Sequence, residues 1–474
     1  MIISGILIAV LAGILLMLVI LTYYLHALKK QHATAFDETD NPIEEEKREQ
    51  VGVIRSCVYA AIVLVSVTLV GALYMGVKGT IYEGHVMEWM NIVVRLMHIT
   101  FGIAWIGASF YFVFLENALN RTKDVRQELA GNLWAVHGGG FYYVEKYKVA
   151  PKEIPKDLHW FKYEAYFTWL TGFSLLFVVY YFNASAMLID KNVWDIPNWE
   201  GICIGIGSFI LAWLIYATLC KTPLVKKGLW FAIIGFLLCT GFAYFYAHVF
   251  NSRAAYIHLG AMIGTLMVGN VFFVIIPAQK AMVKAAKEGS FLNPELGKHA
   301  GLRSLHNNYF TLPVLFVMVS NHFPSTFGND NPWLILAIFS LGVAGVKHYL
   351  NLKEKGQLTY WVMPVSVLIL LSAAYISAPQ KEGECRSNVS FEEVNKIVQK
   401  RCVACHSSHP TDDVYTKAPN GVMYDTPEAI VKLKDKIMQR VVITKTMPQN
   451  NKTNITQKER DMIRCWIDQG ASIK

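Results

Sequence analysis

The chain has 474 residues, of which 54% are hydrophobic, and it carries a formal net charge of +9. This composition favours an integral membrane protein over a soluble protein of two or three domains. The Lys and Arg residues lie mostly between apolar runs. The positive charge therefore indicates membrane topology, and we expect no nucleic-acid partner.

Apolar runs long enough to cross a bilayer recur from the N-terminus to residue 377. A segment in lipid must satisfy its own backbone hydrogen bonds, so each run is predicted to be a helix. The sequence thus predicts an all-α fold, a polytopic transmembrane bundle of about ten helices in the lipid bilayer. The predicted spans are 2–25, 53–76, 88–115, 163–183, 199–220, 229–249, 255–278, 307–325, 332–350 and 358–377.

Basic residues are concentrated in alternate predicted loops, from Lys29 and Lys30 to the last group, Lys347, Lys353 and Lys355. By the positive-inside rule these loops are cytoplasmic, which places both the N-terminus and the C-terminal tail outside. We expect a bacterial inner membrane, with the tail on the periplasmic side. The first segment lacks a basic start and a small-residue cleavage site, so it is predicted to be an uncleaved anchor.

The tail contains the motif Cys402-Val403-Ala404-Cys405-His406. C-x-x-C-H is the pattern for covalent attachment of c-type haem, in which both thiols form thioethers and the histidine binds iron. Met447 is the expected second axial ligand, because a His/Met pair raises the haem potential in electron-transfer cytochromes. One covalent haem c is therefore predicted, with Cys402 and Cys405 as attachment points and His406 and Met447 as iron ligands. A redox dithiol or half of a zinc site is the alternative, but neither a second Cys pair nor a βαβ pattern accompanies the motif.

Capping-box patterns predict a helix on each side of this motif, one beginning at Ser390 and one at Thr456. Helix, haem motif, methionine loop and helix match the layout of a small class I cytochrome c domain. The predicted parts are an N-terminal helix pair at 1–86, the main bundle at 87–378 and the cytochrome c domain at 379–474. In an oxidising compartment, Cys385 and Cys465 could form a disulfide.

Long stretches of the membrane part resemble one family of enzymes. They are Arg95–His98 with Gly102–Gly107, Trp134–Tyr142, Leu158–Ala165, Gly264–Pro277 and Arg303–His322. Through them, residues 88–474 resemble the cytochrome-c-coupled membrane urate oxidases, or urate hydroxylases of the PuuD type. The resemblance implies oxidation of urate to 5-hydroxyisourate, with electrons leaving through haem c to a terminal cytochrome oxidase or a soluble cytochrome c. The first two predicted helices fall outside it and look like an addition.

Polar groups within membrane spans are costly, so each is a functional candidate. Urate is a monoanion with amide-like edges, and its site should supply a cation, amide groups and an aromatic face. Two local clusters supply these groups: Arg303 with Asn307 and Asn308, and Lys162 with Trp160 and His159. Anchoring at the membrane interface is the alternative for Lys162 and Arg303.

A histidine could remove a proton from the purine, because its pKa lies close to physiological pH. We select His98, His159 and His306 for this role. His98 also begins a stripe on one helix face with Gly102, Trp105 and Ser109, which suits a ligand of haem b or a substrate contact. The alternative for His98 is a hydrogen bond to a neighbouring helix. Gly138–Gly140 is either a backbone approach to a ligand or a flexible loop.

Three functions are compatible with these patterns. The first is a membrane urate oxidoreductase, the second a non-catalytic membrane-anchored cytochrome c that carries electrons to a terminal oxidase, and the third a transporter with a redox sensor. The number of polar side chains within the spans argues against a mere anchor, for which one helix would suffice.

Overall fold

The computed structural model describes residues 76, 80, 82–122, 124–151, 153–155, 158–357, 359–378, 385, 388–415 and 417–473. The predicted spans 2–25 and 53–76, apart from residue 76, lie outside the described residues. The chain divides into two compact units, Met1–Met90 and Asn91–Lys474.

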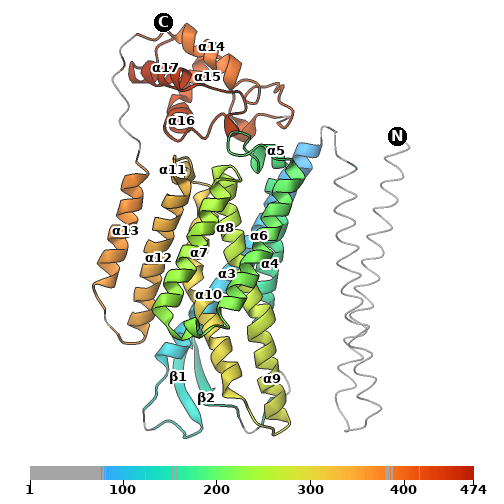
Figure 1. The fold of residues 1–474 in the computed structure, drawn as a ribbon, viewed down its shortest axis with the longest axis vertical. Coiled ribbons are helices and arrows are strands. Elements are labelled where there is room, and N and C mark those ends of the chain that lie inside the picture. The colour runs from blue at the N-terminus through green and yellow to red at the C-terminus, as the bar shows by residue number, and fades with distance from the viewer. Residues whose placement is uncertain are drawn as a thin grey trace. The chain divides into compact units, whose positions relative to one another are not determined.

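Helices make up most of the described chain, as the sequence predicts (Figure 1). The longer helices before residue 378 are α3 (Glu83–Ala118), α4 (Tyr163–Leu175), α6 (Asn198–Leu219), α7 (Gly228–Ala247), α8 (Ser252–Gly269), α9 (Ile276–Lys287), α10 (Pro294–Ser320), α12 (Pro332–Glu354) and α13 (Val362–Ile376). Shorter segments are η1 (Leu176–Tyr181), α5 (Ala184–Met187), η2 (Pro223–Lys226), η3 (Asn270–Ile275) and α11 (Pro324–Phe327).

Five helices in the described part of the chain are long and apolar enough to cross a membrane. They are Glu83–Ala118, Asn198–Leu219, Gly228–Ala247, Ser252–Lys287 and Pro332–Glu354. The fourth is continuous because α8 passes through the π-helical segment η3 into α9. Lys280, Lys284 and Lys287, which the sequence suggests as loop residues, are exposed residues of α9.

Helix α10 begins 13 residues before the predicted span 307–325. Its start is set by Asn293, whose side chain accepts a hydrogen bond from the backbone N–H of Glu295, followed by Pro294 at the first helical position. Hydropathy misses this first part because the residues after Pro294 are largely polar. The longer helix carries Arg303 and His306 as helical residues.

The described chain is mostly helical, consistent with the all-α prediction, and one antiparallel hairpin of β1 (Leu129–His137) and β2 (Gly140–Tyr147) interrupts it. Gly138 and Gly139 are the turn residues, with φ of +58° and +80°. Two consecutive positive φ values are what a tight hairpin turn requires, and glycine adopts them without steric cost. The glycine run of the sequence thus serves the turn.

The core of the bundle lies between α6, α7, α8 and α10 and is rich in aromatic side chains such as Tyr246, Phe250 and Tyr256. At Gly260 on α8, an added Cβ would lie 2.5 Å from Cγ1 of Val317 on α10. The absence of a side chain is therefore what lets these two helices approach. Four residues later, Gly264 has no such neighbour.

The tail folds around its own hydrophobic core, which includes Val394, Ile430, Ile463 and Trp466. Its elements are α14 (Phe391–Arg401), η4 (Pro419–Gly421), α15 (Pro427–Lys432), α16 (Lys434–Ile437), η5 (Met438–Ile443), η6 (Gln449–Asn451) and α17 (Gln457–Asp468). Both predicted capping boxes are present, at the starts of α14 and α17.

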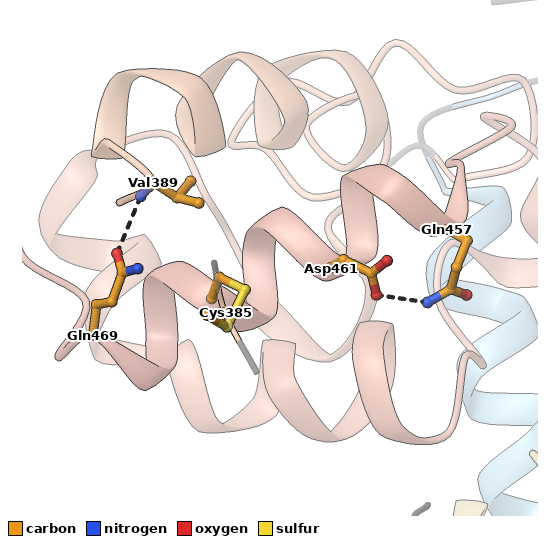
Figure 2. The surroundings of a disulfide bond; sticks show 6 residues. Cys385, Val389, Gln457, Asp461 and Gln469 are labelled. Atoms are coloured by element: carbon orange, nitrogen blue, oxygen red, sulfur yellow. Dashed lines mark hydrogen bonds between the residues drawn. A yellow bond between two sulfur atoms is a disulfide. The ribbon is translucent and has the colours of Figure 1, made fainter. Parts of the chain in front are cut away.

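A disulfide joins Cys385 to Cys465, as predicted, with a Cα–Cα distance of 5.5 Å. Figure 2 shows Cys385 beside α17. In the same region the side-chain oxygen of Gln469 accepts a hydrogen bond from the backbone N–H of Val389 at 3.1 Å. The disulfide thus ties the start of the tail to its last helix.

Candidate functional site

A break in regular helix geometry places an amide in the centre of the bundle. The helix changes from α8 to the π-helical segment η3 at Asn270, which is 0% exposed. Single π-helical turns within α-helices occur frequently at functional sites. A buried amide is costly unless it is hydrogen-bonded, so its partners are informative.

Asn270 bonds to three side chains from two other helices. Its Oδ1 accepts a hydrogen bond from Nη1 of Arg303 at 3.2 Å. Its Nδ2 donates to the hydroxyl oxygen of Tyr216 at 2.9 Å and to Oδ1 of Asn307 at 2.8 Å. Asn307 in turn donates to the backbone carbonyl of Met267 at 3.0 Å. The amide therefore links α6, η3 and α10 in one polar network.

Tyr216 also bonds to Nδ1 of His306 at 2.8 Å. The phenol oxygen also accepts from Asn270, and either Tyr216 or His306 can be the donor of the bond between them. The imidazole stacks on Phe231, with ring centroids 4.8 Å apart and an interplanar angle of 15°. A tyrosine and a histidine are thus held in position for proton transfer.

Arg303 supplies a buried positive charge to this network. It is 7% exposed, and its guanidinium carbon lies 4.8 Å from the centroid of the Tyr216 ring. Within the described residues, no carboxylate forms an ion pair with it. A buried charge without a counter-charge is costly, and a bound anion would offset that cost. Arg303, Asn270, Asn307, Tyr216 and His306 are hereafter called the arginine network.

The structure separates Asn308 from this network. Consecutive residues of a helix point about 100° apart, and Asn308 accepts a hydrogen bond from Asn351 of α12 at 2.8 Å. The predicted cluster of Arg303, Asn307 and Asn308 therefore consists of two residues on one side of α10 and one on another.

His98 lies elsewhere, on α3 against α4. Its Nδ1 is 3.0 Å from the backbone carbonyl of Thr168 and 3.2 Å from Oγ1 of Thr171. A Cβ at Gly172 would lie 2.8 Å from the His98 ring, so glycine makes room for the imidazole. This is the hydrogen bond to a neighbouring helix that the sequence left as an alternative. A role for His98 as a haem b ligand stays a prediction.

His159 and Lys162 lie just before and at the start of α4. Nζ of Lys162 is 4.9 Å from the Tyr163 ring, and His159 packs edge-on against Phe161. Their neighbour Trp160 lines a surface pocket of about 330 Å³ with lysines of α9. Among the described residues, no hydrogen bond or ring contact joins His159 or Lys162 to the arginine network.

Sequence reasoning missed Asn270 and Tyr216 as site residues. Asn270 carried a usable signal, because it is an amide within a long apolar run. Tyr216 carried none, since tyrosines are common in such helices and only the fold brings this one to His306.

The C-x-x-C-H motif follows directly after α14. Nδ1 of His406 lies 3.0 Å from the backbone carbonyl of Val422, so this nitrogen donates and Nε2 is left free for a metal ion. Burial lowers the pKa of His406, although its bond to the Val422 carbonyl acts in the opposite direction, and the neutral form that ligates metal is favoured. Cys402 and Cys405 are free thiols, and Met447 packs against the same tail core as Cys402. These residues fit a covalently attached haem.

The two cysteines are not poised as a reactive dithiol. Burial raises the pKa of Cys402 to about 12. The pKa of Cys405 is raised to about 11 by burial and by the adjacent Asp412. Thiols with raised pKa values are weakly nucleophilic at neutral pH. Within the described residues, no group of three or more His, Cys, Asp or Glu side chains is arranged to hold a metal ion, so the zinc alternative gains no support.

The loop that follows Met447 contacts the bundle, and both belong to the unit Asn91–Lys474. Nε2 of Gln449 donates to the backbone carbonyl of Ala186 at 2.6 Å. Nδ2 of Asn450 donates to the carbonyls of Ala186 and Ile189, each at 2.8 Å. The methionine loop is thus attached to the end of α5 and to the residues just after it.

Comparison with known proteins identifies the bundle. The family model described as urate oxidase N-terminal matches residues 84–378, which is more than half of the chain. No curated protein and no solved structure matched the chain. By the extent of the family match, the chain belongs to the urate oxidase N-terminal family.

Proposed function

We propose that the protein is a membrane-bound urate oxidoreductase that converts urate to 5-hydroxyisourate and passes the electrons to a haem c in its own tail. The observation that carries the proposal is the buried Arg303, which has no carboxylate partner among the described residues and lies among amides and next to a tyrosine–histidine pair. Urate is an anion with several amide edges, and this arrangement matches its recognition needs. Family membership supports oxidation of urate as the reaction.

Each group of the arginine network has a defined task. Arg303 holds the negative charge of urate, and Asn307 fixes one amide edge of the purine. A proton leaving urate passes to Tyr216 as the phenol proton moves to Nδ1 of His306, which is the base of the site. Loss of two electrons and addition of one water convert the urate anion to the 5-hydroxyisourate anion and release two protons. No bound oxygen is needed for this reaction.

The electrons need an acceptor close to the bundle. Cys402 and Cys405 would attach haem c, and His406 and Met447 would supply ligands to its iron. When bound, this group supplies one-electron acceptance at a potential raised by the His/Met pair. The onward acceptor is a terminal cytochrome oxidase or a soluble cytochrome c. We place residues 87–378 in a bacterial inner membrane and the cytochrome c domain, 379–474, on its periplasmic side.

The test follows haem c reduction in membranes that contain the protein. Urate is added without oxygen, and absorbance reports the reduced haem. Urate should reduce the haem, and an Arg303→Met variant should lose this reduction, while a Lys355→Met variant, altered at an exposed position just past α12, should keep it. Reduction by quinol but not by urate would favour the non-catalytic electron carrier instead.

A further inference from the structure

The bundle contains a second buried cation, Lys347. Charge patterning groups it with the lysines of a cytoplasmic loop, although the predicted span 332–350 contains it. It lies within α12 and is 3% exposed. Its Nζ lies 4.1 Å from the centroid of the Phe110 ring on α3. Like Arg303, it has no ion pair with a carboxylate among the described residues. A ring contact offsets only part of the cost of removing an ammonium group from water.

One turn further along α12, Asn351 is paired with Asn308 of α10, and each side chain keeps one unpaired end. Nδ2 of Asn351 donates to Oδ1 of Asn308 at 2.8 Å. Nδ2 of Asn308 and Oδ1 of Asn351 are buried, and neither has a hydrogen-bond partner among the described residues. The two residues are 2% and 5% exposed, so water does not reach them freely.

Most buried polar side-chain atoms in proteins have a partner, so these free ends need an explanation. Together they offer one N–H donor and one carbonyl acceptor, which complement the C=O and N–H groups of an amide edge. Lys347 lies four residues before Asn351 and therefore on the same face of α12. A cation one helical turn from a free amide donor and acceptor is suited to a small organic anion that carries an amide edge.

We infer that Lys347, Asn308 and Asn351 form a second binding site for an amide-bearing organic anion, the chemical class of urate and its oxidation product. This inference rests on the proposed function for the identity of the anion. The site is separate from the arginine network because Asn308 faces α12, whereas Asn307 bonds to η3. The protein thus has two buried cations near buried amides: Arg303 bonds to Asn270, and Lys347 lies one helical turn from Asn351 on α12.

The test measures how many urate anions bind to the purified full-length protein in lipid nanodiscs by equilibrium dialysis under anaerobic conditions. The wild type should bind two equivalents, and Lys347→Met should bind one. Lys353→Met, an exposed position on the same helix, should still bind two. Arg303→Met should also bind one equivalent, and the double variant Arg303→Met/Lys347→Met should bind none.

A second variant separates binding from folding. Asn351→Asp keeps the size of the side chain and places a carboxylate four residues after Lys347. The carboxylate and the ammonium group of Lys347 can then form an ion pair. It should lose the second equivalent with no fall in the thermal unfolding midpoint. Two equivalents in both Lys347→Met and Asn351→Asp would overturn the inference and leave the proposed function intact. A wild type that neither binds nor oxidises urate would overturn both.

Discussion

Replacement of Asn270 gives the sharpest test of the arginine network, because one amide holds three partners. Asn270→Leu keeps a similar volume but removes the bonds to Arg303, Tyr216 and Asn307. The guanidinium then loses the acceptor that fixes its position. A hydrogen bond to a charged group contributes about 1.5–3 kcal/mol, and 1.4 kcal/mol corresponds to a factor of ten. We therefore expect kcat/KM for urate to fall by about 10- to 100-fold.

Asn270→Asp distinguishes anion binding from simple support of the fold. The carboxylate keeps the acceptor for Arg303 and adds a negative charge at the same place, 3.2 Å from Nη1 in the native amide. The fold should be retained because Arg303 gains a counter-charge. Urate should bind at least as weakly as in Asn270→Leu, because the positive charge of Arg303 is already neutralised.

Stopped-flow measurement of urate-driven haem c reduction gives kcat/KM, and thermal unfolding of the same samples controls for stability. Asn388→Asp, at an exposed position just before α14, is the matched control. If Asn270→Asp reduces haem c with wild-type kinetics, the arginine network is not the urate site. A loss of activity that parallels a large loss of stability would also refute the reasoning.

Four further predictions concern the tail. Met447→Ala should retain covalent haem but lose the methionine-to-iron absorption band and lower the haem potential, as measured by redox titration. Asn450→Ala removes the two bonds from the methionine loop to the bundle, and it should slow urate-driven haem reduction while dithionite still reduces the haem fully. Cys465→Ser opens a loop closed by residues 80 apart and should lower the free energy of unfolding of the tail by about 4 kcal/mol in urea titrations. Burial alone would raise the pKa of Glu459, but its hydrogen bonds and Arg401 lower the pKa overall. Ionised Glu459 therefore stabilises the folded tail fully above the ordinary Glu pKa, and this stabilisation is lost as the pH falls through the folded pKa. Urea midpoints of the tail should therefore fall below about pH 4, and Glu459→Gln should flatten this dependence.

Local patterns in the sequence predicted local structure well. Each capping box is recognised from four consecutive residues, and α14 and α17 begin directly after Ser390 and Thr456. The disulfide was also predictable, because only two cysteines of the tail lie outside the C-x-x-C-H motif. The Gly138–Gly139 turn was not recognised, since hydrophobic residues on both faces of the hairpin hide its alternation.

Partners across helices were beyond the sequence. Asn307 and Asn308 are neighbours in the chain, yet their bonding partners lie on η3 and on α12. Which side chain meets which depends on the rotation of each helix about its axis, and adjacent positions differ by about 100°. The burial of Lys347 was not predicted for a related reason. Near a helix end, a lysine has the same sequence context whether it anchors at the membrane interface or is buried.

The arrangement around α10 is unfavourable for stability alone. Arg303 and Lys347 are both buried, and neither has a carboxylate partner among the described residues. Apolar side chains of similar size usually replace buried ionic groups at no cost or with a gain in stability. A bundle that served only to anchor the tail would need neither cation, nor the free amide ends of Asn308 and Asn351. These groups are consistent with one requirement: an anion with amide edges must leave water and enter the bundle, and each group replaces a contact that the anion had with its hydration shell.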